Sequence, residues 1–151
     1  SFDHFVNVYM YWIYSNSYVY FNVWRIFMVK NLEAAKELLA HYKSLTLAYL
    51  QSEWQKFSDQ FGSEMSITGG DVMQGITGFG TTGSCTLCHA CRVNCDECIY
   101  SVMDDVDEDY YTCLDITYYK MDNAFTPEKL YEAIQFRIAR LEKAIELCNK
   151  S

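Results

Sequence analysis

Cys85-Thr-Leu-Cys88-His-Ala-Cys91-Arg-Val-Asn-Cys95-Asp-Glu-Cys98 is the stretch around which this chain of 151 residues is organised. Five of the seven cysteines lie within it. Two thiolates that are two residues apart can bind one metal ion from a single turn, and a second such pair completes a tetrahedral site. Cys85 with Cys88, and Cys95 with Cys98, are two such pairs. The spacing therefore predicts a closed, structural zinc site in a compact knuckle over residues 85–98.

Three further residues can take part in the same site. Cys91 and His89 lie between the two pairs, and Cys113 follows later in the chain. Thiolate and imidazole are both common zinc ligands. Each of the three is therefore an alternate ligand to one member of the two pairs.

The cysteines also fit a second metal. Cys85, Cys88, Cys91 and Cys95 follow the cysteine spacing of bacterial ferredoxins, although Asp96 stands where that pattern has proline. Ferredoxins of that type carry two such runs, and this chain has one. An iron–sulfur cluster in a small electron-transfer protein is thus the alternative to zinc.

The segments on either side of the cysteines have helical patterns. Asn31 can cap a helix, and Thr46 or Ser44 can cap a second one whose apolar residues recur at steps of three and four up to a stop at Gly62. These apolar residues are Leu47, Leu50, Trp54, Phe57 and Phe61. The short connection between the two helices predicts an antiparallel αα-hairpin.

The C-terminal part begins with the helix signal Thr126-Pro127-Glu128. Leu130, Ile134, Ile138, Leu141, Ile145 and Cys148 then form one apolar face to the end of the chain. Arg137 and Arg140, with several glutamates, are expected on the opposite, polar face. A short helix from Asp71 to about Thr77 and a solvated acidic loop over 104–109 complete the prediction.

Residues 1–27 differ in composition from the rest, because they hold eleven of the 25 aromatic residues. Three interpretations remain open. The segment is a leader that is disordered or foreign to the native protein, with Met28 as a true start. It forms a β-hairpin with a second strand from Tyr18 to Trp24, or it inserts into a membrane over the twenty uncharged residues from Phe5 to Trp24.

The overall charge limits the partners. A formal net charge of -8 is unsuited to binding nucleic-acid backbone, so we expect an unknown protein partner, and a membrane only if residues 1–27 insert. The segment lacks the features of a usual signal peptide, and clustered cysteines are typical of a reducing cytoplasm. The three histidines, His4, His41 and His89, form no familiar catalytic motif, and we therefore expect no enzymatic activity.

Four sequence features together resemble small cysteine-knuckle proteins of tailed phages and prophages. They are the two Cys-x-x-Cys pairs, the later Cys113, the closing Thr126-Pro127-Glu128 helix and the glycine-rich lead-in at 72–80. The resemblance covers residues 28–151 and implies a phage accessory protein in the host cytoplasm, with no assigned reaction. We expect a mainly α-helical domain over 28–151, an αα-hairpin plus a long C-terminal helix, with the cysteine knuckle inserted at 85–98.

Overall fold

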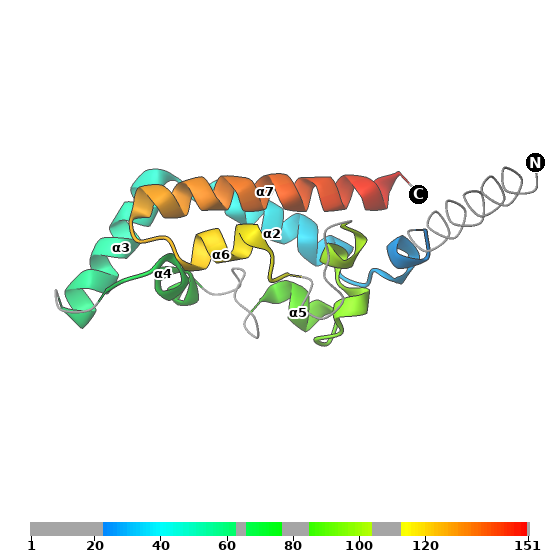
Figure 1. Cartoon of the computed structure of the whole chain (residues 1–151), viewed down its shortest axis with the longest axis horizontal. Helices are drawn as coiled ribbons and strands as arrows, with labels where there is room; N and C mark the ends of the chain where they lie inside the picture. Colours follow the sequence, from blue (N-terminus) through cyan, green and yellow to red (C-terminus); the bar gives the residue numbers. More distant parts are fainter. Residues whose placement is uncertain (1–22, 63–65, 77–84, 104–112, 151) are drawn as a thin grey trace, which may run out of the picture.

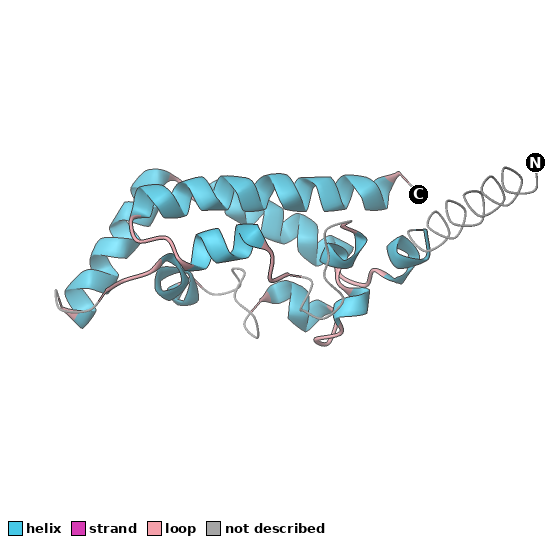
Figure 2. Cartoon of the chain, in the orientation of Figure 1, coloured by secondary structure: helices cyan, strands magenta, loops and turns pink. Residues whose placement is uncertain are grey.

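The computed structural model describes residues 23–62, 66–76, 85–103 and 113–150, and these ranges hold helices and loops but no strand (Figure 2). The mainly helical fold is therefore confirmed. The elements in chain order are α2 Leu32–Ser44, α3 Leu47–Phe61, α4 Gly69–Gly75, α5 Thr86–Ala90, η1 Cys95–Glu97, η2 Ile99–Val102, α6 Ile116–Asp122 and α7 Pro127–Asn149.

Helix α7 is the long C-terminal helix that the sequence predicts. Thr126 caps it by accepting a hydrogen bond from the backbone N–H of Lys129, and Pro127 occupies its first turn. The helices α2, α3 and α6 and the turn η2 all pack on it (Figure 1). We call α2, α3 and α7 the helical frame, because the remaining elements are arranged along it.

The predicted apolar face of α7 forms much of the core. Leu130, Ile134 and Leu141 are completely buried, Ile138 and Ile145 nearly so, and Cys148 is half-buried. Burying one such aliphatic side chain stabilises a fold by roughly 1.5–3 kcal/mol. The side of α7 that faces the core therefore contributes a large share of the hydrophobic stabilisation.

The predicted αα-hairpin of α2 and α3 is wrong. Each helix packs on α7, and their contact with one another is minor. The two residues between them, Leu45 and Thr46, have extended backbone, and Leu45 is itself buried. The chain therefore changes direction there, and α3 leaves the end of α7 at an angle (Figure 1).

This direction also leaves the apolar stripe of α3 partly open. Leu50 is buried, Trp54 and Phe57 are half-buried, and Phe61 is 45% exposed. The cap at Thr46 and the stop at Gly62 are both confirmed, and Gly62 has the positive φ of 81° that favours glycine.

The short helix predicted from Asp71 to about Thr77 is present with shifted bounds. Helix α4 starts at Gly69, two residues before the predicted Asp71, because Thr68 and Asp71 form a capping box.

The N-terminal segment differs from the β-hairpin interpretation where the structure describes it. Residues 23–28 are helical, so the predicted second strand is wrong at Val23 and Trp24. Residues 1–22 and the acidic loop lie outside the described residues. Of the helices that the structure describes, none has the length and apolar character that a membrane crossing requires.

Candidate metal centre

The cysteine segment, residues 85–103, consists of three short helical pieces. Cys85 precedes α5, Cys88 lies within it, Cys95 opens η1 and Cys98 separates η1 from η2. Each Cys-x-x-Cys pair thus spans one turn, which is the local arrangement that the spacing predicts. Cys85, Cys91 and Cys98 are buried, whereas Cys88 and Cys95 are half-buried and His89 is exposed.

A strained reversal joins the two pairs. Arg92 and Val93 have φ values of 53° and 62°, and the N–H of Val93 donates to the carbonyl of Cys88 over 2.7 Å. The left-handed conformation is rare for a β-branched residue and costs roughly 1–2 kcal/mol for each non-glycine residue. The surrounding contacts must offset this cost, and the reversal directs the chain from the first pair to the second.

Asn31 connects the cysteine segment to the helical frame. The Asn31 Nδ2 donates to the carbonyl of Leu87 over 3.1 Å and to Cys98 Sγ over 3.3 Å, and its Oδ1 accepts from the N–H of Ile99 over 2.8 Å. The side chain is 1% exposed. Asn31 was predicted as a helix cap; it does occupy the N-cap position of α2, but its side chain makes no capping hydrogen bond there.

Burial keeps two thiols of the segment, Cys91 and Cys98, in the protonated form. Burial, together with the neighbouring sulfurs of Cys98, Cys88 and Cys95, raises the pKa of Cys91 to about 11. Burial also raises the pKa of Cys98, while the hydrogen bond from Asn31 lowers it without cancelling that effect. A metal ion would have to displace these protons, because the thiolate is the ligand.

Cys113, outside the segment, belongs to the same neighbourhood. Burial raises its pKa to about 12, the positive charge of Arg137 opposes that rise, and the sulfurs of Cys88, Cys98 and Cys85 reinforce it. Cys113 is thus an electrostatic neighbour of three of the four predicted ligands. Cys148, in the last turn of α7, lacks these sulfurs among the causes of its raised pKa, which is due to burial.

The sulfurs are not assembled into a finished metal site. All seven cysteines are described and none forms a disulfide. Within the described ranges no group of three or more His, Cys, Asp or Glu side chains has the arrangement that holds a metal ion. What does fit a thiophilic metal is the donor chemistry: several buried thiols on adjacent turns, with an amide N–H already directed at one sulfur.

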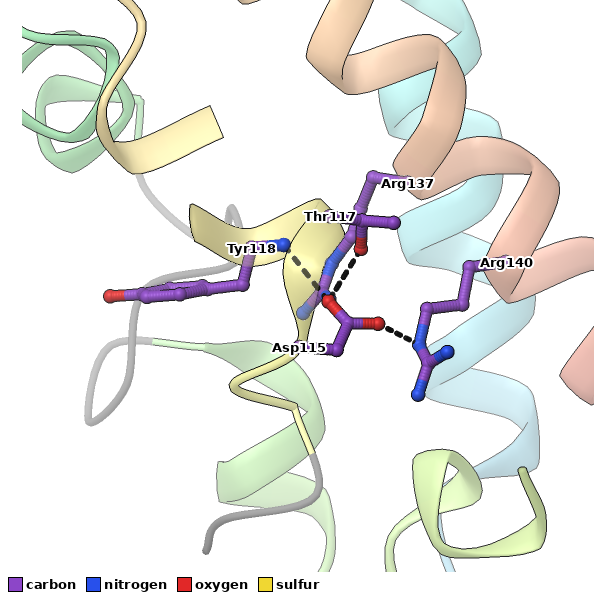
Figure 3. Close-up of polar contacts among 5 residues, drawn as sticks. All are labelled: Asp115, Thr117, Tyr118, Arg137 and Arg140. Carbon is purple, nitrogen blue, oxygen red and sulfur yellow. Dashed lines mark hydrogen bonds and ion pairs between the residues drawn. The ribbon is translucent and has the colours of Figure 1, made fainter. Parts of the chain in front are cut away.

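A buried arginine cluster lies beside the cysteine segment, and the sequence did not predict it. Asp115 caps α6, and its Oδ1 accepts from the Tyr118 N–H over 2.9 Å and from the Thr117 hydroxyl over 2.6 Å (Figure 3). Arg137 Nη1 donates to Asp115 Oδ1 over 2.9 Å and to Thr117 Oγ1 over 3.0 Å, and Arg140 Nε pairs with Asp115 Oδ2. We define the arginine cluster as Asp115, Thr117, Arg137, Arg140 and Tyr100.

The prediction that Arg137 and Arg140 lie on the polar face of α7 is wrong, since they are only 1% and 8% exposed. The spacing along the helix could have indicated this burial. Arg137 is three residues after Ile134 and four before Leu141, so it points to the same side of the helix as these core residues. Spacing could not identify their partner Asp115, because Asp115 lies before α6, and the whole of α6 separates it from α7 in the sequence.

Tyr100 joins the arginine cluster to the cysteines. It follows Cys98 by two residues, and its ring centroid lies 4.4 Å from the Arg137 guanidinium carbon and 5.8 Å from that of Arg140. Burial raises the pKa of Tyr100 well above its usual value, Arg137 opposes this, and the nearby sulfurs of Cys85 and Cys98 add to it. The Tyr100 hydroxyl and Arg137 Nε are buried without a hydrogen-bond partner in the described structure.

The cluster holds two buried positive charges. Both guanidiniums pair with the carboxylate of Asp115. Burial would lower the pKa of Arg137, but the electron-rich neighbours Tyr100, Tyr42 and Asp115 outweigh that effect and raise it. Arg137 therefore stays charged. A buried charge is costly, so negative charge nearby stabilises it.

Comparison of the chain with protein-family models, with curated protein sequences and with solved structures finds no match.

Proposed function

We propose that the chain is a non-enzymatic, protein-binding protein whose cysteine segment is stabilised by a zinc ion bound to Cys85, Cys88, Cys95 and Cys98. Cys91, Cys113 and His89 remain alternate ligands. In this proposal zinc supplies a structural cross-link between the two Cys-x-x-Cys turns. The clustered thiols and the resemblance to phage cysteine-knuckle proteins support a place in the cytoplasm, where thiols stay reduced.

The buried positive charge of Arg137 beside the cysteines carries the proposal. One zinc ion with four thiolates has a net charge of 2 − 4 = −2. Arg137 is 1% exposed, and its guanidinium carbon lies 4.4 Å from the ring centroid of Tyr100, two residues after Cys98. A buried cation in this position would stabilise an anionic metal–thiolate centre. Arg137 already acts on Cys113 at a distance where its charge changes the pKa of that thiol.

Two local features add support. The Asn31 amide that donates to Cys98 Sγ is the kind of outer hydrogen bond that orients a metal ligand and stabilises its thiolate form. The left-handed turn at Arg92 and Val93 holds strain that needs compensation. Binding of structural zinc contributes on the order of 10 kcal/mol in small metal-dependent folds, far more than that strain.

The test is the metal content of the full chain, purified without oxygen. We expect about one zinc per chain and no visible colour. Cys98→Ser should lose the metal, whereas the matched variant Cys148→Ser should keep it, because Cys148 lies in the last turn of α7, outside the segment, and its raised pKa reflects burial and no neighbouring sulfur. Cys95→Ser and Cys113→Ser then decide which of these two thiols is a ligand. A protein that stays metal-free when given zinc would contradict the proposal, and a brown, iron-containing protein would replace it with the electron-transfer alternative.

A further inference from the structure

An open cavity lies between the end of α6 and the beginning of α7, away from the cysteines. Its volume is about 430 Å³, within the range of roughly 300–1,000 Å³ typical of binding pockets. Phe125 and Phe136 line it, and these side chains are 66% and 46% exposed. Two large aromatic rings exposed around one hollow are unusual on a surface, and they provide a place for another apolar side chain.

Two lysines give the cavity its charge. Lys120 and Lys129 both line it, together with the single carboxylate of Glu132. Lys120 Nζ lies 4.3 Å from the ring centroid of Phe136, and Lys129 Nζ lies 3.2 Å from Glu132 in an ion pair whose side chains are 71% and 57% exposed. Such an exposed pair is weak, so Lys129 can exchange its partner at little cost. The lining has a net charge of +1 on a chain of -8.

The wall that α6 contributes is fixed by close packing. The N–H of Gly69 donates to the carbonyl of Ala124 over 2.6 Å, and Ala124 itself lines the cavity. A Cβ at Gly69 would collide with the carbonyl oxygen of Met121, so only glycine permits this approach of α4 to α6. A site that is already formed loses little entropy when a ligand binds.

We propose that this cavity is the docking site for a segment of a protein partner that presents an aromatic or branched aliphatic side chain next to one carboxylate. The apolar side chain would lie against Phe125 and Phe136, and the carboxylate would face Lys120 and Lys129. The single surplus positive charge of the lining matches a single carboxylate. A second copy of this chain is disfavoured as the occupant, because it would bring another -8 to the same surface. The inference rests on the protein-binding part of the proposed function and does not require zinc.

The experiment measures binding of labelled short peptides to the full chain by fluorescence anisotropy. The probe peptide carries one tryptophan next to one glutamate among neutral residues. Two further peptides replace the glutamate by glutamine or the tryptophan by alanine. We expect saturable binding of the first peptide and weaker binding of the other two.

The variants form matched pairs. Phe136→Ala should weaken binding roughly tenfold, as loss of an anchoring contact does. Phe61→Ala, which removes an equally exposed aromatic ring at the end of α3, should leave binding unchanged. Lys129→Gln should weaken binding by about twofold to fivefold, and Lys36→Gln, which breaks the similar Lys36–Glu33 pair, should not.

The inference would be overturned if the tryptophan–glutamate peptide did not bind, or if Phe61→Ala weakened it as much as Phe136→Ala. It would also be overturned if sedimentation showed a dimer of the wild-type chain that Phe136→Ala dissociates, since the occupant would then be a second copy. Zinc is measured in the same samples. A zinc-free chain that binds the peptide contradicts only the metal proposal, and a zinc-loaded chain that does not bind it contradicts only the docking site.

Discussion

The helical frame and the cysteine segment share one core but differ in the length of their helices. The frame helices have 13, 15 and 23 residues and meet through apolar faces on α7. The pieces of the cysteine segment have 5, 3 and 4 residues. Helices shorter than about 12 residues are marginal on their own in water. The comparison teaches that the cysteine segment depends on its packing and hydrogen bonds to the helical frame, and that its position is sensitive to each of those contacts.

The segment contributes Leu87, Ile99, Val102 and Met103 to the buried core, and specific polar contacts add to this packing. Besides the three hydrogen bonds of Asn31, the N–H of Lys30 donates to the carbonyl of Glu97 over 2.9 Å, and Arg25 donates to the carbonyl of Ser101 over 3.1 Å. The arginine cluster adds Tyr100, which packs against Arg137 of α7. Substitutions at these contacts should therefore affect the segment more than similar substitutions elsewhere.

The largest effect is expected at Asp115. Asp115→Asn removes the carboxylate that pairs with both Arg137 and Arg140 and should lower the free energy of unfolding by about 3–5 kcal/mol, because each buried guanidinium then loses this partner. Urea unfolding measures it. Glu142→Gln is the control, since it breaks an exposed pair with Lys43 and should cost less than about 1 kcal/mol. An equal cost for both variants would show that the arginine cluster is not a special site.

The next effect is expected at the N-cap positions. Asn31→Ala leaves the Ile99 N–H unsatisfied in the interior, removes the hydrogen bonds to the Leu87 carbonyl and Cys98 Sγ, and should cost about 2–4 kcal/mol. Thr46→Ala removes an ordinary, exposed helix cap and should cost about 1 kcal/mol. Both are measured by urea unfolding. If Asn31→Ala lowered the free energy of unfolding no more than Thr46→Ala, Asn31 would act as an ordinary helix cap and would not hold the cysteine segment in place.

Tyr42 provides a pH-dependent test inside the frame. Burial raises its pKa from 10.0 to about 12. The phenol of the unfolded chain therefore ionises first as pH rises. Its contribution to stability is fully present below about pH 10 and is lost toward pH 12, by roughly 2–3 kcal/mol. Tyr42→Phe should lose less stability than wild type between pH 9 and 11 in urea unfolding, and parallel curves would contradict the assignment.

The smallest effect is expected at the strained turn. Val93→Gly removes the penalty of a β-branched residue at a φ of 62° and should stabilise the chain by up to about 1 kcal/mol. Ala90→Gly, in the neighbouring α5, should instead destabilise it by about 0.5–1 kcal/mol. The two thermal unfolding midpoints should move in opposite directions. A loss of stability in both variants would mean that the turn is not strained.

The predictable parts of this fold are those that local sequence determines. Thr126 and Pro127 start α7, Thr46 starts α3, and the spacing of Leu130, Ile134 and Leu141 marks the core side of the last helix. The angle between α2 and α3 is different, because it depends on the backbone of Leu45 and Thr46 and on a third helix on which both pack. A short connection alone could not determine it.

The candidate site divides in the same way. The two Cys-x-x-Cys pairs were visible because each lies within one turn. The residues that surround them were hidden because their partners are distant in the sequence. Asn31 reaches Cys98 across 67 positions, and Arg137 reaches Asp115 across 22. A single sequence contains no periodic signal for such pairs. A buried arginine on an apolar helix face was the clue that the pattern did offer.

Hydrogen exchange with and without a zinc chelator tests the account most directly. It reads residues 85–103 and the middle of α7 in the same sample of the full chain. We expect the chelator to speed exchange in residues 85–103 by at least about tenfold while α7 keeps its protection, because zinc in this proposal fastens only the segment. Unchanged exchange in residues 85–103 after the loss of measured zinc would contradict the claim that a metal holds the cysteine segment on the helical frame.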